Sequence, residues 1–249
     1  MLNGLYLSAM GAKVQDARVD VAANNLANLN TTAFRRDQAV FRFRPAEQAM
    51  AGAPDALFQA VGGGVFLQKV ASSDEEGALK ETGHDLDLAL QGPGFFKVRD
   101  AQGNAFYTRA GNFRRDDAGF LVTGDGRYRV QGLGGGGLEV PEGQIDINEA
   151  GEVYSGGTQV GQVGVVMPPQ ADRLRKRGDN LWVSAVDAED GPSTAQVRQG
   201  FLEESSVDGP REMTEMIQAQ RMYEFSLKAL RIQDELLGRT VTDVGRATA

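Results

Sequence analysis

Residue types that carry out catalysis are few in this chain and scattered along it. The single histidine, His84, stands beside Asp85, just before a segment of alternating apolar and polar residues. A general acid or base needs neighbouring groups that orient it and set its pKa. No such set is evident around His84, so we interpret it as a surface or capping residue and predict that the protein is not an enzyme.

Acidic residues occur in clusters that resemble metal ligands or paired catalytic carboxylates. Asp85 and Asp87 fall on one face of a predicted strand, but the residues that follow do not complete the ligand string of a calcium loop. The acidic runs at 74–76 and 116–117 are typical of solvated charges in turns, and a glycosidase needs two acids across one cleft. We predict no metal site and no cofactor.

Glycine runs and basic residues also lack the context of a binding site. The glycines at 134–137 lead into Leu138 rather than into a helix, so they do not predict a phosphate loop. The basic run at 173–177 has no interleaved aromatic residues, and the chain has a net charge of -8. An acidic chain is a poor candidate for binding nucleic acid or an anionic membrane. No apolar run approaches the length of a membrane span, and no cysteine is present.

The strongest pattern lies at the start of the chain, in residues 2–28. Spacings of three and four alternate along a stripe that is apolar except for one acid: Leu2, Leu5, Ala9, Ala12, Asp16, Val19, Ala23 and Leu26. This heptad stripe predicts a helix that ends between Asn28 and Asn30. Because the stripe is narrow, it favours a helix facing other helices. An amphipathic helix covering a local core is the alternative.

The last segment repeats this rhythm. Its stripe has polar residues at two positions and consists of Met213, Met216, Gln220, Tyr223, Leu227, Leu230, Asp234, Leu237, Val241 and Val244. Asp208 or Gly209 is predicted to cap this helix, with Pro210 in its first turn. We expect the helix to run to about Leu237, beyond which the tail either frays or continues the helix.

The middle of the chain has the pattern of an antiparallel β domain. Short apolar segments are separated by turns rich in glycine and aspartate, which favours a sandwich or barrel. The predicted fold is mixed α and β: terminal helices pair in a coiled-coil-like domain, and an all-β antiparallel domain is inserted between them. The expected divisions are a helix in 1–34, a linker or extended connecting region in 35–80, the β domain in 81–200, and a second helix in 201–249. Within 35–80, one strand is expected at 39–43, and a period-two pattern begins at Val65.

Several motifs in series resemble one protein family. The segment 23–28, followed by 31–34, resembles the N-terminal signature of bacterial flagellar rod and hook proteins, although Ala33 stands where the family usually has glycine. The family's central domain is resembled at 92–96, 107–113, 119–122 and 178–182. Its C-terminal signature is resembled at 200–203, 212–217 and 220–224. Together these motifs cover nearly the whole chain in the family's order.

This resemblance implies an axial structural protein of the flagellar basal body, polymerised into a tube with copies of itself and with other rod and hook subunits. It also implies export through the flagellar export apparatus without a cleaved signal peptide. The length is similar to that of the proximal or distal rod proteins. The signature residues are Asn25, Leu26, Asn28, Phe34, Gln220, Arg221, Tyr223 and Glu224. The helical stripes add Leu5, Ala12, Val19, Met213, Met216, Leu227, Leu230 and Leu237 to the predicted assembly interface.

Two other functions stay open from the sequence. The first is a hook-type axial subunit. The second, of a different class, is a secreted carbohydrate-binding or hydrolytic β domain with helical tails.

Overall fold

A computed structural model describes residues 2–44, 64–169, 174–184 and 189–247. The chain divides into two compact units. The helical unit consists of Met1–Leu29, Arg36–Asp74 and Val207–Ala249, and the β unit consists of Asn30–Arg35 and Glu75–Ser206. Helices at both ends and an inserted antiparallel β domain confirm the predicted fold class.

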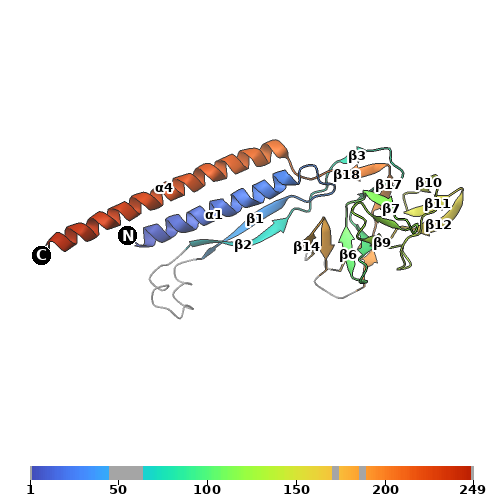
Figure 1. The fold of residues 1–249 in the computed structure, drawn as a ribbon, viewed down its shortest axis with the longest axis horizontal. Coiled ribbons are helices and arrows are strands. Elements are labelled where there is room, and N and C mark those ends of the chain that lie inside the picture. The colour runs from blue at the N-terminus through green and yellow to red at the C-terminus, as the bar shows by residue number, and fades with distance from the viewer. Residues whose placement is uncertain (1, 45–63, 170–173, 185–188, 248–249) are drawn as a thin grey trace. The chain divides into compact units, whose positions relative to one another are not determined.

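The helical unit contains two helices, α1 at Leu2–Ala27 and α4 at Gly209–Ala247, which run side by side in opposite directions (Figure 1). Two side-chain contacts define their pairing. Ser8 donates a hydrogen bond to Gln233 Oε1 over 3.4 Å near the start of α1. At the other end, Asn25 Nδ2 lies 3.1 Å from Glu212 Oε2. The helix pairing predicted from the two stripes is therefore made within a single chain.

Small residues bring the helices close together. Ala12 and Ala22 of α1 are 6% and 4% exposed, and Ala219 of α4 is 4% exposed. A Cβ atom added at Gly4 would lie 3.3 Å from the Gln233 side chain, and one added at Gly11 would lie 3.6 Å from Ser226 Oγ. Short side chains at these positions allow close backbone approach, as in other tightly packed helix pairs.

The buried stripe of α4 differs from the predicted one. Met216, Tyr223 and Leu227 are partly buried as expected, but Met213, Gln220 and Asp234 are exposed. Their neighbours are more buried: Glu212, Ala219 and Gln233. A straight helix drifts about 20° per heptad from a strict seven-residue repeat, so a fixed alternation of three and four does not follow one face. The same drift leaves Asp16 and Ala23 of α1 exposed.

Helix α4 does not end near Leu237 but continues through Gly238 to Ala247, so the tail extends the helix, one of the two outcomes that the sequence left open. A glycine inside a helix costs only about 1 kcal/mol relative to alanine. That cost alone does not end a long helix.

A β-hairpin packs along α1 where the sequence predicted a strand at 39–43 and a period-two pattern from Val65, but not their pairing. Strand β1, Asp37–Arg44, pairs antiparallel with β2, Gly64–Ser72, with a bulge at Val40/Phe41. The Arg18 guanidinium of α1 lies 5.3 Å from the centre of the Phe41 ring. Helix α1 thus contacts both α4 and the hairpin. The predicted linker's residues 45–63 lie outside the described residues.

The β unit is built from short antiparallel strands. Its largest sheet has the order β14-β15-β6-β5-β9-β8-β7, with β13 pairing both β5 and β16. A second sheet has the order β10-β11-β12, and β17 and β18 pair with β4 and β3. The strands are β3 Leu79–Glu81, β4 Leu88–Gln91, β5 Phe95–Arg99, β6 Ala105–Thr108, β7 Phe113–Arg115, β8 Leu121–Thr123, β9 Arg129–Val130, β10 Ile145–Ile147, β11 Glu152–Ser155, β12 Thr158–Gln162, β13 Val165–Met167, β14 Arg175–Gly178, β15 Leu181–Val183, β16 Gly191–Pro192, β17 Gln196–Gln199 and β18 Phe201–Glu203.

One apolar core joins these sheets. Alternate residues of β5, Phe96 and Val98, are fully buried, and the Phe96 ring lies edge-on to Phe113 with centroids 5.1 Å apart. Leu121 of β8 brings the β7–β8 hairpin into the same core, and Val153 of β11 brings in the second sheet. Alternation along short strands, with glycine or aspartate in the turns, gives one buried face to each sheet.

The residues first considered for catalysis do not form a site. His84 and Asp85 are exposed, and Asp87 accepts a hydrogen bond from Thr82 over 2.7 Å. Within the described ranges, no group of three metal-binding side chains is present and no helix is long and apolar enough to cross a membrane. Arg173 of the basic run lies outside those ranges.

Candidate assembly interface

Asn25, near the C-terminal end of α1, is the centre of a polar cluster in the helical unit. Its side chain is inaccessible to solvent. The Nδ2 group donates to the carbonyl of Asp37 over 2.9 Å and to Glu212 Oε2, and Oδ1 accepts from the Asp37 backbone N–H over 2.9 Å. An asparagine can satisfy a donor and an acceptor together. Asn25 therefore ties the start of β1 to both helices.

Arg36 supplies the positive charge of this cluster. Its guanidinium donates through Nε to Glu212 and through Nη2 to Glu215 Oε2 over 2.9 Å. The Glu212 side chain is 1% exposed, so its charge depends on Arg36 and Asn25 for compensation. The cluster joins α1, β1 and the first turns of α4 at one end of the unit.

The start of α4 is defined by residues that suit a helix N-terminus. The backbone N–H of Arg211 donates to Asp208 Oδ1 over 3.3 Å, so Asp208 is the cap that was predicted. Pro210 occupies the first turn, where its missing N–H costs nothing. Glu212 follows in that turn, where a negative charge is favourable.

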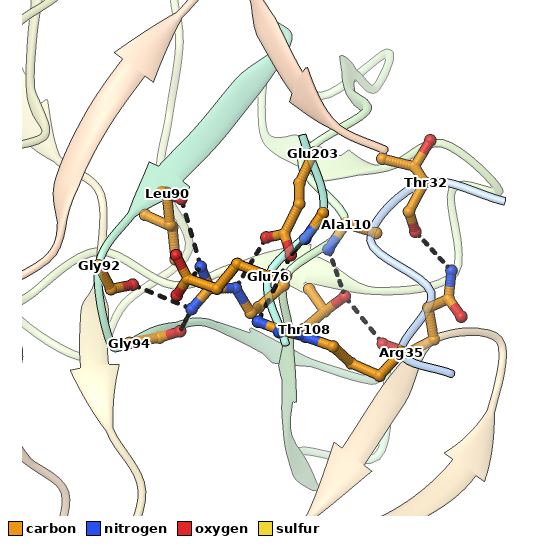
Figure 2. Close-up of polar contacts among 12 residues, drawn as sticks. Thr32, Arg35, Glu76, Leu90, Gly92, Gly94, Thr108, Ala110 and Glu203 are labelled. Carbon is orange, nitrogen blue, oxygen red and sulfur yellow. Dashed lines mark hydrogen bonds and ion pairs between the residues drawn. The ribbon is translucent and has the colours of Figure 1, made fainter. Parts of the chain in front are cut away.

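A second buried polar network organises the β unit around Arg109, which directly follows β6. Figure 2 labels its members Glu76, Glu203, Gly92 and Gly94. The guanidinium contacts Glu203 Oε2 at 2.8 Å and Glu76 Oε1 at 3.0 Å. It also donates to the carbonyls of Gly92 and Gly94, each over 3.0 Å. One 3% exposed side chain thus holds together four segments that are distant in sequence.

The segment 30–35 belongs to this network rather than to α1. Arg35 Nη2 lies 3.4 Å from Glu203 Oε1, and the Ala33 N–H donates to the Glu203 carbonyl over 2.8 Å. Asn180 Nδ2 donates to the carbonyl of Thr32 over 2.7 Å (Figure 2). Ala33 has a φ of 53°, the left-handed conformation that glycine adopts without steric cost. The motifs at 31–34, 107–113 and 178–182 therefore meet in space.

The predicted assembly residues fall into two groups. Twelve are buried or partly buried: Leu5, Ala12, Val19, Asn25, Leu26, Asn28, Phe34, Met216, Tyr223, Leu227, Leu230 and Leu237. The exposed ones are Met213, Gln220, Arg221 and Glu224. Phe34 lies in the β unit, where the Lys176 Nζ is 4.2 Å from its ring centre. The buried group stabilises the single chain, and the exposed group faces solvent in it.

Sequence reasoning missed an apolar stripe on another face of α4. Met222, Phe225, Ile232 and Leu236 are 50%, 66%, 50% and 51% exposed. Their spacings of three, seven and four place them along one side of the helix. The helical spacing of these residues is visible in the sequence. The neighbouring stripe of Tyr223 and Leu227 has the same period, and only that stripe was recognised.

The buried charges were missed for a different reason. Arg36, Arg109, Glu203 and Glu212 look like surface residues in the sequence, because charged side chains are seldom fully buried. Their buried ion-pair partners lie 94 to 176 residues away along the chain, so only the structure shows that these charges are buried in pairs.

Comparison with known proteins gives three matches that follow the chain in order. Residues 5–35 match the flagella basal body rod protein family, 89–155 match the flagellar hook protein FlgE/F/G D1 domain, and 198–243 match the flagellar basal body rod FlgEFG protein C-terminal family. The flagellar basal-body rod protein FlgG of Bacillus subtilis strain 168 is 35% identical over 97% of this chain and 98% of its own length. The chain belongs to the flagellar basal-body rod protein family.

Other rod proteins are similar over the same extent. Rod protein FlgF of Caulobacter vibrioides is 35% identical over 99% of both chains. Rod protein FlgG of Agrobacterium fabrum is 33% identical over 94% of this chain and 97% of its own. This rod protein is therefore a structural subunit of the flagellar basal body, and that reading fits better than a hook subunit or a glycan-active domain.

The family matches coincide with the structural parts just described. The N-terminal match contains Asn25, Phe34 and Arg35, and the C-terminal match contains Glu203 and Glu212. Each of the two buried polar networks in this rod protein thus draws residues from both terminal matches.

Proposed function

We propose that this rod protein polymerises through its terminal helices into the axial tube of the flagellar rod, next to other rod and hook subunits. The observation that carries the proposal is the apolar stripe of Met222, Phe225, Ile232 and Leu236, which lies half exposed or more on α4. Exposed apolar patches on an otherwise polar helix mark interaction sites. A second copy supplies the matching helices.

The paired helices make a neighbouring copy a suitable occupant. In the single chain, Tyr223 and Leu227 of α4 face inward, while Phe225 and Ile232 face solvent. Helices with apolar residues on two faces are buried between neighbours in larger bundles. The predicted interface residues that are exposed, Met213 and Gln220 among them, then lie in reach of further copies.

The rest of the proposal concerns what the subunit does not bind and how it reaches the basal body. It acts without catalysis, cofactor, nucleic acid or membrane insertion. It reaches the basal body through the flagellar export apparatus without a cleaved signal peptide. Support comes from its membership of a structural family and from the exposed position of His84.

A charge placed on the exposed stripe tests the assembly mechanism. Burying a phenylalanine contributes roughly 2 kcal/mol, and a buried unpaired carboxylate costs more than that. Phe225→Asp is therefore expected to abolish polymer formation, seen by electron microscopy, and swimming in a strain that relies on this protein. Its far-ultraviolet circular dichroism should match the wild type, because Phe225 is 66% exposed in the single chain.

Arg231→Asp is the matched control, since it places a carboxylate at an exposed position on a different side of α4. It should keep most of the polymer. Normal polymers with Phe225→Asp would refute the proposal. Leu26→Asp and Leu227→Asp are expected to abolish polymers too, but both residues are partly buried in the single chain, so they also test its fold. Asp85→Asn and His84→Ala should leave swimming unchanged.

A further inference from the structure

Three arginines form a row across one face of the large sheet in the β unit. Arg99 of β5 lies opposite Arg129 of β9, and Val122 of β8 lies opposite both Arg129 and Arg114 of β7. Residues directly opposite one another in antiparallel strands point to the same face. The other face belongs to the core, where Val98 is fully buried. We call Arg99, Arg114 and Arg129 the arginine row.

The charges of this row are poorly compensated within the chain. Within the described ranges, the side chains of Arg99 and Arg114 make no ion pair or hydrogen bond, and Arg99 Nε is buried without a partner. Arg129 has Asp116 at 3.6 Å and lies 4.4 Å from the centre of the Phe120 ring. Like charges placed opposite one another destabilise a sheet, and a bound anion would remove that cost.

Packing accounts for the stems of these arginines but not for their charges. Val122 is 2% exposed although it lies on the same face, between Arg129 and Arg114. Aliphatic stems of long charged side chains cover apolar residues in this way. Glutamine or methionine would cover Val122 as well, so the guanidinium groups themselves point to an anionic partner.

The sheet of β10, β11 and β12 belongs to the same unit (Figure 1), and one of its faces carries acidic side chains, opposite in charge to the arginine row. Asp146 of β10 lies opposite Tyr154 of β11, and Glu152, two residues earlier on β11, points to the same side. Asp146 is exposed, and no partner for its side chain occurs in the described part of the chain. Ile147 and Val153 face the core from the other side. We call Asp146 and Glu152 the acidic face.

We propose that the arginine row of one copy docks on the acidic face of a second copy. Arginine forms directional, charge-assisted hydrogen bonds with carboxylates. The two surfaces are different patches of one chain, so the contact is head-to-tail and can repeat along a filament. It rests on the proposed self-assembly and adds to the helices a second, electrostatic contact. A chain of net charge -8 otherwise repels its copies.

Charge exchange in the full-length chain tests this contact. Association of the purified protein is followed by sedimentation velocity over a concentration series, in about 50 mM and about 500 mM salt, where screening differs strongly. Arg114→Glu and Asp146→Arg should each move association to about tenfold higher concentration in low salt. The double variant Arg114→Glu/Asp146→Arg should recover most of the loss, because it restores opposite charges across the contact.

Lys80→Glu is the control, because it makes the same charge change at an exposed residue of β3. It should shift association less than Arg114→Glu does. Equal shifts, a double variant as weak as the single ones, or a wild type that stays monomeric in low salt would overturn the proposal. Unchanged association in Arg114→Glu, with an anionic polysaccharide bound instead, would also overturn it. Phe225→Asp reports separately on the helices, so loss of one contact is distinguishable from loss of the other.

Discussion

Arg109 and Glu203 form a buried ion pair in the β unit, with Nε 2.8 Å from Oε2 and side chains 3% and 1% exposed. The same carboxylate accepts the backbone N–H of Gly77 over 3.1 Å and lies 3.4 Å from Arg35. Glu203 is therefore the shared acceptor of three segments. Together with Asn180, which donates to the Thr32 carbonyl, and Lys176, which donates to the Arg35 carbonyl, Glu203 holds residues 30–35 in the β unit.

Replacing Glu203 by glutamine is expected to destabilise the β unit severely. Removing one partner of a buried pair leaves the other charge uncompensated and costs about 3–5 kcal/mol. The free energy of unfolding, measured by urea denaturation with the Trp182 fluorescence of the β unit, should fall by that amount. The neighbouring variant Glu204→Gln breaks only the exposed 3.7 Å pair with Lys80 and should cost less than 1 kcal/mol. Equal losses in the two variants would contradict the assigned role of Glu203.

Ala33 should tolerate glycine unusually well for a buried alanine. Its left-handed φ of 53° costs an L-residue roughly 1–2 kcal/mol, which glycine avoids. That gain offsets the lost methyl burial and the higher entropy of unfolded glycine, together about 1.5 kcal/mol. Ala33→Gly is therefore expected to keep the wild-type stability within about 1 kcal/mol.

Ala89→Gly is the matched comparison, since Ala89 is 0% exposed in β4 and has no positive φ. Ala89→Gly loses the same methyl burial and raises the entropy of the unfolded chain in the same way, but it relieves no left-handed strain. Its free energy of unfolding in urea should fall by about 1.5 kcal/mol. A larger loss with Ala33→Gly than with Ala89→Gly would show that the left-handed conformation carries no strain.

Asn25→Leu should loosen the helical unit. The substitution leaves the Asp37 N–H and one oxygen of Glu212 without their buried partner, at a cost of about 1–3 kcal/mol for each group. The thermal transition seen at 222 nm should shift to lower temperature. Asn24→Ala removes two 3.3 Å hydrogen bonds of an exposed residue, one to Asp37 and one from Asn28, and should shift the transition far less. The role assigned to Asn25 fails if both variants melt alike.

Asp100 gives the turn after β5 a pH dependence. Hydrogen bonds from the Asn104 side chain, and from the backbone N–H groups of Asn104 and Gln102, hold the pKa of the Asp100 carboxyl below its usual value of 3.8. Because the pKa is lower in the folded state, the hydrogen bonds of Asp100 contribute to folding stability above pH 3.8. That contribution is lost as the pH falls through the folded pKa. Carbon-detected NMR titration should report this low value, and Asn104→Ala should raise it. A titration unchanged by Asn104→Ala would contradict the hydrogen-bond cause.

Local pattern predicted most elements of this protein, although not the pairing of β1 with β2. The stripes of three and four predicted both helices, and Asp208 with Pro210 predicted where α4 begins. Glycine and aspartate turns predicted the antiparallel β domain, because these residues favour turns whatever packs on them later. The serial motifs also predicted the rod family, which the comparisons confirm.

Tertiary structure decided which face each helix buries and which charges are buried. Periods of 3.5 and 3.6 residues are nearly equal over a few turns. The sequence alone therefore could not show that Met216 and Ala219 face inward. Nor could it show that Met213 and Gln220 face solvent. It also could not show that Arg109 meets Glu203, or that the arginine row forms across β5, β9 and β7. Those contacts depend on strand register and on segments far apart in the chain, and register is set only when the whole core packs.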